Sequence, residues 1–492
     1  MSDPARAVAA SFRDPAGRVV LLPERVLRAV RADAVRDLDA FLASPAATTL
    51  GLRGNLVRTK TLDAASVAAL EREPLLTSLP SLAPIFRGAA RVLEHERIWF
   101  PAYPYEWSPA MLFDAALLTL SLAEGLLPSA LGLKDATPYN ILFRAAQPVF
   151  VDVLSVERRE PRDATWLPYA QFVRTFLLPL LVWQRYRLSL SGVFLAHRDG
   201  LEPEDVYRIA GPLARLSPPL FGLVTMPAWL GAKHDLDDQT IYQAKLMSDP
   251  ERARFVLAAQ LRRLRKTLYK VAPRADKSTW SDYMKSHSYS DAHFAGKEKF
   301  VRDALAETTP APGQPEMAVL DVGCNTGFFS FLAAERAGTS VVALDYDPEV
   351  VDRVFREAQK RNANVLPLVV DLTRPSPAMG WRNTEAASFL DRARGRFDLV
   401  LMLAVIHHML VSERIPLEDI VDLAADLTRD AAVIEYVDPS DAMFRRLTRG
   451  RDALHSGLTR ASFEQAVARR FHIARSQEQG TRTLYFLRKK PA

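Results

Sequence analysis

Short apolar runs alternate with amphipathic stretches along the C-terminal half of the chain, and several of the apolar runs end in an acidic residue. Five buried strands are predicted at 319–322, 341–345, 365–371, 397–403 and 431–437, with helices near 348–361 and 416–428. Strands that alternate with helices are typical of a parallel sheet covered on both faces. Two final runs, 471–474 and 481–487, leave no room for a crossover helix. They predict an antiparallel hairpin added to the parallel sheet.

A glycine-containing loop follows the first predicted strand and precedes a helix-like run at 328–334. Its sequence is Asp321-Val-Gly-Cys-Asn-Thr-Gly327. Gly323 and Gly327 allow a ligand to approach the backbone closely. The loop differs from the dinucleotide fingerprint in its glycine spacing and in the preceding Asp321, which a pyrophosphate would avoid. A cationic or amino-acid-bearing ligand would accept that carboxylate. Asp345, at the end of the second strand, lies where an acid can bind ribose hydroxyls.

In this order and spacing, residues of about 280–492 resemble the class I S-adenosylmethionine-dependent methyltransferases. The resemblance implies an α/β, Rossmann-like fold whose last strand is antiparallel. It also implies that the glycine loop and Asp321 hold the methionine part of S-adenosylmethionine, that Asp345 takes the ribose and that Asp371 caps the adenine. The predicted cofactor-binding residues are Asp321, Gly323, Cys324, Asn325, Gly327, Asp345, Asp371 and Leu403.

Methyl transfer requires mainly positioning, together with a base if the acceptor is an alcohol. His407 and His408 follow the fourth strand, and ligands of a doubly wound sheet lie at the carboxyl ends of its strands. We expect at most one of them to face the acceptor, because adjacent residues leaving a strand point in different directions. Both could instead be structural. Glu435 and Asp438, at the end of the fifth strand, are the reserve candidates.

The N-terminal half carries a second pattern, Leu133-Lys-Asp-Ala-Thr-Pro-Tyr-Asn140, followed by Gln147-Pro-Val-Phe-Val-Asp152. It resembles the catalytic loop and metal-binding acid of the protein-kinase-like phosphotransferases. The resemblance implies an α+β domain in which Asp135 is a base, while Asn140 and Asp152 hold magnesium on ATP. Apart from these residues, no metal site is predicted.

Several features depart from that family. Leu133 stands where kinase-like enzymes usually carry histidine, and no convincing glycine-rich phosphate loop precedes it. Lys60, with Glu71 or Glu73 as its partner, is a weak candidate for the phosphate lysine. Three interpretations stay open: an active small-molecule kinase, a nucleotide-binding remnant, and a helical scaffold.

The whole chain resembles a bacterial family of nodulation-protein-related, or NoeA-like, methyltransferases. The segments that carry this resemblance are 103–108, 133–140, 280–283, 289–291 and 482–485. The predicted organisation is a kinase-like or scaffold domain at 1–275, with two lobes split near 105, bridging or lid helices at 276–315, and the methyltransferase domain at 316–492.

Composition adds little to this picture. The 492 residues are 48% hydrophobic and 25% charged, with a net charge of +6, which is ordinary for a globular protein. A basic run at 262–277 indicates either a solvated helix face or a contact with phosphate or a membrane surface. Cys324 is the sole cysteine, so no intrachain disulfide can form.

The location of the chain is predicted to be cytoplasmic. The N-terminus lacks the apolar core of a signal peptide, and the apolar runs at 115–122 and 176–183 are too short to span a bilayer. No nucleic-acid partner is expected, because no aromatic and proline motif of the nucleic-acid methyltransferases follows the fourth strand.

The leading hypothesis is transfer of a methyl group to an oxygen or nitrogen of a small metabolite or glycan. One alternative is a bifunctional kinase and methyltransferase that modifies a bacterial surface polysaccharide or metabolite. Another is a protein that binds S-adenosylmethionine without turnover.

Overall fold

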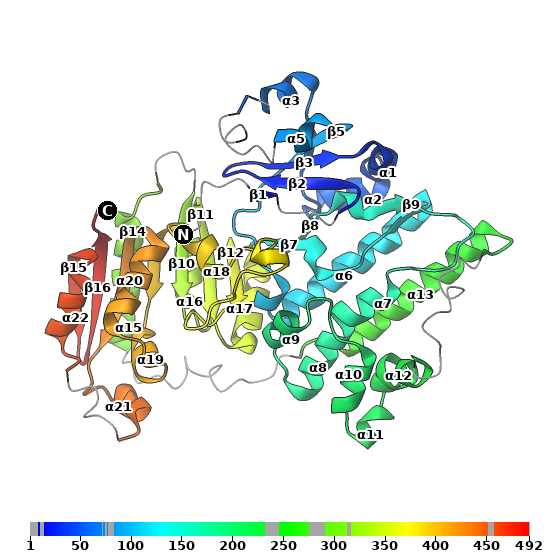
Figure 1. Cartoon of the computed structure of the whole chain (residues 1–492). Helices are drawn as coiled ribbons and strands as arrows, with labels where there is room; N and C mark the ends of the chain where they lie inside the picture. Colours follow the sequence, from blue (N-terminus) through cyan, green and yellow to red (C-terminus); the bar gives the residue numbers. More distant parts are fainter. Residues whose placement is uncertain are drawn as a thin grey trace. The chain divides into compact units, whose positions relative to one another are not determined.

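The computed structural model describes residues 8–9, 14–70, 72–73, 76, 83–231, 246–274, 291–311, 316–450 and 457–491. The chain divides into two compact units (Figure 1). An N-terminal unit runs to Arg274 and includes the short segment Gly380–Ala386, and a C-terminal unit contains the remainder from Ala275. A separate bridging segment at 276–315 stays a prediction, because much of it lies outside the described residues.

The C-terminal unit is built on a seven-stranded sheet of order β12-β11-β10-β13-β14-β16-β15 (Figure 1). Its strands are β10 Met317–Val322, β11 Thr339–Asp345, β12 Val365–Val369, β13 Phe397–Met402, β14 Thr428–Val437, β15 Phe471–Gln479 and β16 Arg482–Lys489. The first five are parallel, and β16 pairs antiparallel with both β14 and β15. The predicted mostly parallel sheet with a reversed final hairpin is therefore confirmed.

The helices of this unit are amphipathic, and their apolar stripes explain why they pack on the sheet. In α17, Pro348–Arg361, the buried side chains include Val350, Val354 and Ala358, which recur every four residues. Asp347 caps its first turn by accepting hydrogen bonds from Glu349 N at 2.9 Å and Val350 N. The other long helices are α15 Asp291–Glu307 and α20 Leu417–Leu427. Helices near 348–361 and 416–428 are thus found as predicted.

Strand order places the functional edge of this sheet. From the central strand β10 the chain continues to β11 and β12 on one side, whereas β13 and β14 lie on the other. The loops after β10 and β13 therefore leave the sheet in opposite directions and open a crevice at the carboxyl ends of these two strands.

The N-terminal unit begins with a five-stranded antiparallel sheet of order β1-β2-β3-β5-β4. These strands are β1 Val8–Ala9, β2 Gly17–Leu21, β3 Val26–Val30, β4 Thr59–Thr61 and β5 Arg91–His95. Two short hairpin-like pairs follow, β6 Leu131–Leu133 with β9 Val156–Arg158, and β7 Ile141–Arg144 with β8 Gln147–Phe150. Helices form the rest of this unit, among them α6 Pro109–Leu126, α8 Leu178–Tyr186 and α13 Pro250–Lys270.

Helix α6 is longer than the apolar run at 115–122 suggested. Ser108 caps its start, and the helical stretch Pro109–Ser129 is long and apolar enough to cross a membrane. It is the one such helix in the part of the chain that the structure describes, and 67% of its most apolar window is buried inside the protein. Its apolar character is accounted for by packing in the core of the N-terminal unit.

Candidate functional site

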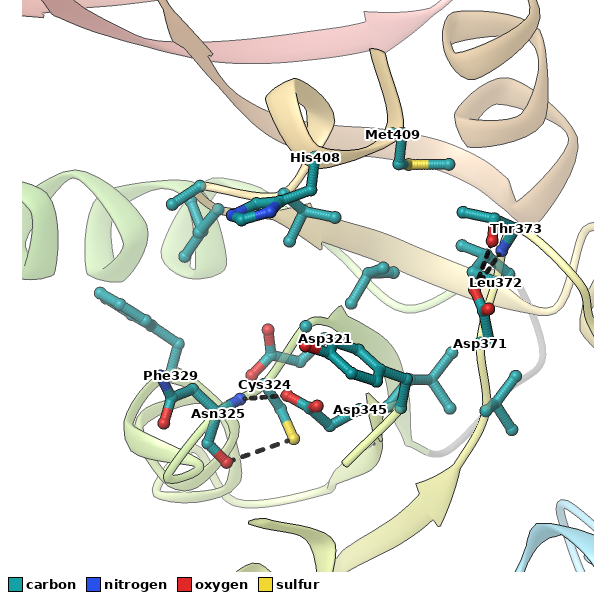
Figure 2. Close-up of a pocket in the computed structure, with 18 of the residues that line it drawn as sticks. Asp321, Cys324, Asn325, Phe329, Asp345, Asp371, Leu372, Thr373, His408 and Met409 are labelled. Atoms are coloured by element: carbon teal, nitrogen blue, oxygen red, sulfur yellow. Dashed lines mark hydrogen bonds between the residues drawn. The ribbon is translucent and has the colours of Figure 1, made fainter. Parts of the chain in front are cut away.

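A cavity of about 450 Å³ lies at the carboxyl ends of the central strands in the C-terminal unit (Figure 2). Its walls come from the loops after β10, β11, β12 and β13, from α15, and from α19 Ile406–Val411. The predicted residues that line it are Asp321, Gly323, Cys324, Asn325, Asp345, Asp371, Leu403 and His408. The tertiary structure therefore gathers residues from four separate loops into one site.

The glycine loop approaches the cavity with a backbone that side chains would obstruct. Gly323 has a φ of +67°, and a Cβ there would lie 2.6 Å from Val405 Cγ2. Gly327 has a φ of +81°, and a Cβ there would lie 2.9 Å from a Phe331 ring carbon. Both positions require glycine for conformation and for space. Gly327 lies just before α16, Phe328–Ala334, and supports the turn without lining the cavity.

Asn325 and Asp345 face each other across this turn (Figure 2). The Asn325 backbone N–H donates to Asp345 Oδ2 at 3.1 Å, and the Asp347 N–H donates to Asp345 Oδ1 at 3.0 Å. Burial raises the pKa of Asp345 to about 6. The carboxylate oxygens accept backbone hydrogen bonds, including one from Tyr346, and their remaining lone pairs suit a vicinal pair of ligand hydroxyls.

Asp321 lies deeper in the cavity. Its Oδ2 accepts a hydrogen bond from Ser330 Oγ at 2.6 Å, and burial raises its pKa to about 6. The Asn325 side-chain Oδ1 is buried and has no hydrogen-bond partner among the described residues. A buried acceptor without a donor is costly, so this oxygen is suited to a ligand N–H group. Burial raises the pKa of the Cys324 thiol, which makes Cys324 a packing residue of the wall.

The opposite end of the cavity is formed by the loop after β12 (Figure 2). Asp371 Oδ1 accepts from the Thr373 backbone N–H at 2.9 Å and from the Thr373 hydroxyl at 2.5 Å. These bonds hold the Asp371 carboxylate in place beside the apolar side chains of Leu372 and Leu403, which also line this region. An aromatic base with one exocyclic amino group fits such an arrangement.

The two adjacent histidines occupy different environments. His408 lines the cavity and lies across it from Asn325 and Asp345 (Figure 2), and burial, together with the Arg482 cation, lowers its pKa. His407 is buried behind it, does not line the cavity, and has its pKa lowered to about 3 by burial. The expectation that at most one histidine faces the acceptor agrees with this geometry.

Glu435 belongs to a buried ionic network beneath the cavity. Lys297 Nζ lies 2.5 Å from Glu435 Oε2, and Arg482 Nη1 lies 3.4 Å from Glu435 Oε1. Asp441 completes the network, 3.0 Å from Arg482 Nε. Glu435 is 1% exposed and does not line the cavity, so the structure places this reserve base away from the acceptor space. Asp438 also lies outside the lining and is held by Ser440.

Sequence reasoning missed several wall residues. Lys297, Phe328 and Phe329 line the cavity but are not among the site residues predicted from the sequence. Phe294 of α15 packs edge-to-face on Phe328 with ring centroids 4.8 Å apart, and both line the cavity with Phe329. Three phenylalanines around a glycine loop are a signal that a pattern search could use. Trp280, Tyr283 and Tyr289, in the predicted bridging or lid segment at 276–315, lie outside the described residues.

The donors and acceptors of the cavity suit S-adenosylmethionine. The backbone cradle at Gly323 and the open acceptor Asn325 Oδ1 suit its amino-acid part, and the carboxylate of Asp345 suits its ribose. Two buried acids, Asp321 and Asp345, favour a ligand with cationic groups over a pyrophosphate. The assignment of a role to each residue remains a proposal.

In the N-terminal unit, the three residues predicted to serve phosphoryl transfer already have protein partners. Arg28 Nη1 lies 2.6 Å from Asp152 Oδ1 and 3.6 Å from Asp14 Oδ2. Asn140 Nδ2 donates to Ser155 Oγ at 3.2 Å, and burial raises the pKa of Asp135. No group of three or more acids, histidines or cysteines in the described residues could hold a metal ion. Arg28 occupies one oxygen of Asp152, so magnesium bound there would compete with the guanidinium for that carboxylate.

The predicted phosphate lysine Lys60 and its predicted partners Glu71 and Glu73 are not shown as a pair either. Lys60 is exposed on β4, while Glu73 lies 3.6 Å from Arg25, and Glu71 lies outside the described residues. In the basic run, Arg265 pairs with Glu124 at 2.9 Å and Arg262 lies over the Phe255 ring. Lys277 lies outside the described residues. Only part of this run is therefore available to an anionic partner.

Comparison with known proteins gives one family match and one relative along nearly the whole chain. Residues 293–473 match a family described as "Methyltransferase domain". The chain is 29% identical over 487 residues to "Nodulation protein NoeA" of Rhizobium meliloti (strain 1021), which covers 97% of this chain and 95% of that protein.

Three solved structures that are similar to this chain each cover less than half of it. Monomeric WbdD is 20% identical to this chain with a TM-score of 0.28, and the match covers 41% of this chain and 42% of the WbdD chain. A second structure is magnesium protoporphyrin IX methyltransferase (ChlM) from Synechocystis PCC 6803, solved with bound SAH. It is 17% identical with a TM-score of 0.30, and the match covers 43% of this chain and 92% of the ChlM chain. A SAM dependent methyltransferase from Aquifex aeolicus is 16% identical with a TM-score of 0.29, and the match covers 44% of this chain and 100% of the Aquifex chain.

Proposed function

We propose that this S-adenosylmethionine-dependent methyltransferase, whose residues 293–473 match the methyltransferase domain family, methylates a hydroxyl oxygen of a small metabolite or glycan. His408 is the base that takes the hydroxyl proton. One observation carries the proposal: His408 lines the cavity opposite the glycine loop, and its pKa is lowered by burial and by Arg482. A histidine with a lowered pKa is neutral at pH 7 and able to accept a proton.

The cofactor, when bound, supplies a methyl group on a positively charged sulfur. Asp345 accepts the ribose hydroxyls, and Asn325 Oδ1 together with Asp321 faces the amino-acid part. The acceptor enters between His408 and the phenylalanine wall of Phe294, Phe328 and Phe329. The His408 imidazole would take the hydroxyl proton of the acceptor when its oxygen receives the methyl group that the cofactor would supply.

The buried network supports this step from behind. Lys297 is 5% exposed and lines the cavity, yet its charge is balanced by Glu435 at 2.5 Å. Arg482 is held between Glu435 and Asp441; burial and the Arg482 charge lower the pKa of His408, which favours the neutral imidazole and also makes it a weaker base. The network therefore fixes α15, β14 and β16 around the cavity and keeps the base neutral.

The experiment starts from a screen of metabolite extracts for transfer of labelled methyl groups. On the acceptor found, turnover and cofactor affinity are measured for His408→Ala and for His472→Ala, whose side chain is exposed on β15. We expect His408→Ala to lose about a hundredfold in turnover with unchanged cofactor affinity. His472→Ala keeps wild-type turnover.

Near-normal turnover of His408→Ala on the true acceptor would contradict the proposal and favour a nitrogen acceptor that needs no base. Absence of labelled product from any extract would favour the alternative of a protein that binds the cofactor without turnover. Phosphoryl transfer is not part of the proposal, because Arg28 holds Asp152. A cytoplasmic location stays a prediction.

A further inference from the structure

A second cavity, of about 350 Å³, lies in the helical part of the N-terminal unit. It is lined by Gln184 and Arg185 of α8, by Pro218 and Pro219, and by Lys270 and Arg274 at and after the end of α13. Three of its lining residues are cations and none is an acid. No function assigned above uses this cavity, which is distinct from the site between the loops of the C-terminal unit.

Among the residues that the structure describes, no carboxylate neutralises the three cations. Across the described ranges, Arg185, Lys270 and Arg274 form no ion pair with a carboxylate. Arg185 makes one contact across the cavity, from Nη2 to the Pro218 carbonyl oxygen at 3.4 Å. A guanidinium has five N–H donors, so most of those of Arg185 remain available to a ligand. Arg265 of the same basic run differs from these three cations, because its charge is paired with the carboxylate of Glu124.

The backbone that carries these cations is held in place. Gln184 Nε2 donates to the Lys270 carbonyl at 3.1 Å and to the Ala272 carbonyl at 3.3 Å. These bonds tie the end of α13 to α8 and satisfy carbonyl groups that the helix end leaves open. The spacing of Arg185 relative to Lys270 is therefore set by the fold of the unit, which gives a pre-formed positive cavity.

Exposed apolar side chains lie close in sequence to Pro218 and Pro219, which form one wall of the cavity. Leu213 and Leu216 precede Pro218, and Phe221 follows Pro219, and all three are exposed. Leu188 and Tyr269, near Arg185 and Lys270 in the sequence, are exposed as well. A positive cavity with apolar neighbours suits a ligand that presents a phosphate group attached to an apolar or carbon-rich body.

We propose that this cavity binds a phosphate group, carried either by a soluble phosphate ester or by the headgroup of an anionic lipid. Arg185 and Arg274 offer guanidinium donors suited to phosphate oxygens, and Lys270 adds a compact ammonium. The basic run at 262–277 thus acts through Lys270 and Arg274 at its end, together with Arg185 from another helix, and not through its whole length.

Two variants of the full-length chain test the site. Lys270→Gln with Arg274→Gln removes two cations of the cavity. Arg263→Gln with Lys266→Gln removes the same two kinds of charge from the exposed face of α13, outside the cavity. All four side chains are exposed, so both double variants should fold, which is checked by circular dichroism.

The probes are inorganic pyrophosphate, followed by calorimetry, and vesicles of phosphatidylcholine with or without phosphatidylglycerol, followed by co-sedimentation. We expect the cavity variant to lose at least about tenfold in affinity for the probe that binds, while the matched control changes little. Binding of pyrophosphate identifies a soluble phosphate ester, and binding only to the phosphatidylglycerol vesicles identifies a lipid headgroup. If neither probe binds wild type, or both double variants lose affinity equally, the proposal is wrong.

Discussion

Asp345 in the C-terminal unit ends a strand and Asp152 in the N-terminal unit lies just after one, but the neighbours of the two acids differ. Asp345 is contacted by the backbone N–H groups of Asn325 and Asp347, and it lines a cavity of about 450 Å³. Asp152 contacts the Arg28 guanidinium at 2.6 Å. Backbone donors orient a carboxylate without neutralising it, whereas a guanidinium satisfies its charge.

The difference shows that an acid becomes a ligand site only where the protein leaves its charge or its lone pairs available. Glu435 makes the same point within the C-terminal unit itself. It lies at the end of β14, yet Lys297 and Arg482 occupy both of its oxygens. Measurements on these three acids therefore test the distinction between an open carboxylate, whose lone pairs are available to a ligand, and a closed one, which is paired with cations.

The largest effect is expected from Glu435→Ala, which leaves Lys297 and Arg482 buried without their shared partner. Removing one member of a buried ion pair costs about 3–5 kcal/mol in the free energy of unfolding. Hydrogen exchange of the β14 and β16 amides in increasing urea measures this cost for the C-terminal unit alone. Asp303→Ala, which breaks an exposed pair with Lys299, is the control and should change little. Equal protection in the two variants would mean that the network is not stabilising.

The second effect concerns the open carboxylate. Asp345→Ala should weaken S-adenosylmethionine binding by about 1.5–3 kcal/mol, or at least tenfold, because charge-assisted hydrogen bonds to the ribose are lost. Calorimetry measures the affinity, with Asp303→Ala again as the control. Asp152→Ala should leave this affinity unchanged. An unaltered affinity in Asp345→Ala would remove Asp345 from the cofactor site.

The third effect is a pH dependence of cofactor binding. Burial raises the pKa of both Asp321 and Asp345 to about 6. The ionised carboxylates are the better acceptors, so affinity should be full above pH 6 and fall as the pH drops through 6. Protonation of each acid lowers the cofactor affinity by at most about tenfold per pH unit. Titration calorimetry between pH 7.5 and about pH 5 tests the direction. Asp345→Asn should show a shallower decline, and a flat profile in wild type would contradict the role of both acids.

The smallest expected effect is that of ATP with magnesium on the N-terminal unit. Because Arg28 holds Asp152 and Ser155 holds Asn140, we expect no magnesium-dependent thermal shift. The measurement is a thermal-shift titration of the full chain with ATP, with and without magnesium. A magnesium-dependent shift that disappears in Asp152→Ala would show that Arg28 yields to the metal, and the contrast with Asp345 would then fail.

Local patterns are sufficient to predict the C-terminal sheet, and eight of the predicted site residues line one cavity at its edge. Strands such as β10 and β13 are buried along their whole length and read as continuous apolar runs, and α17 shows a four-residue apolar repeat. The residues at the carboxyl ends of such strands must lie together once the sheet forms. The position of Asp345 at a strand end predicts a ligand contact on that basis, the methyltransferase resemblance adds Asp321 and Asp371, and all three line one cavity.

The sequence by itself thus determined the fold of the C-terminal unit and the edge of its sheet at which the cavity lies. It did not determine which charges would be neutralised, because ion pairs such as Arg28 with Asp152 join residues 124 positions apart. Nor could it separate His407 from His408, since one residue of rotation at the start of α19 decides which imidazole enters the cavity. Only the tertiary structure brings distant charges within a few ångströms, and at that distance the neighbours of a carboxylate or imidazole decide what it can do.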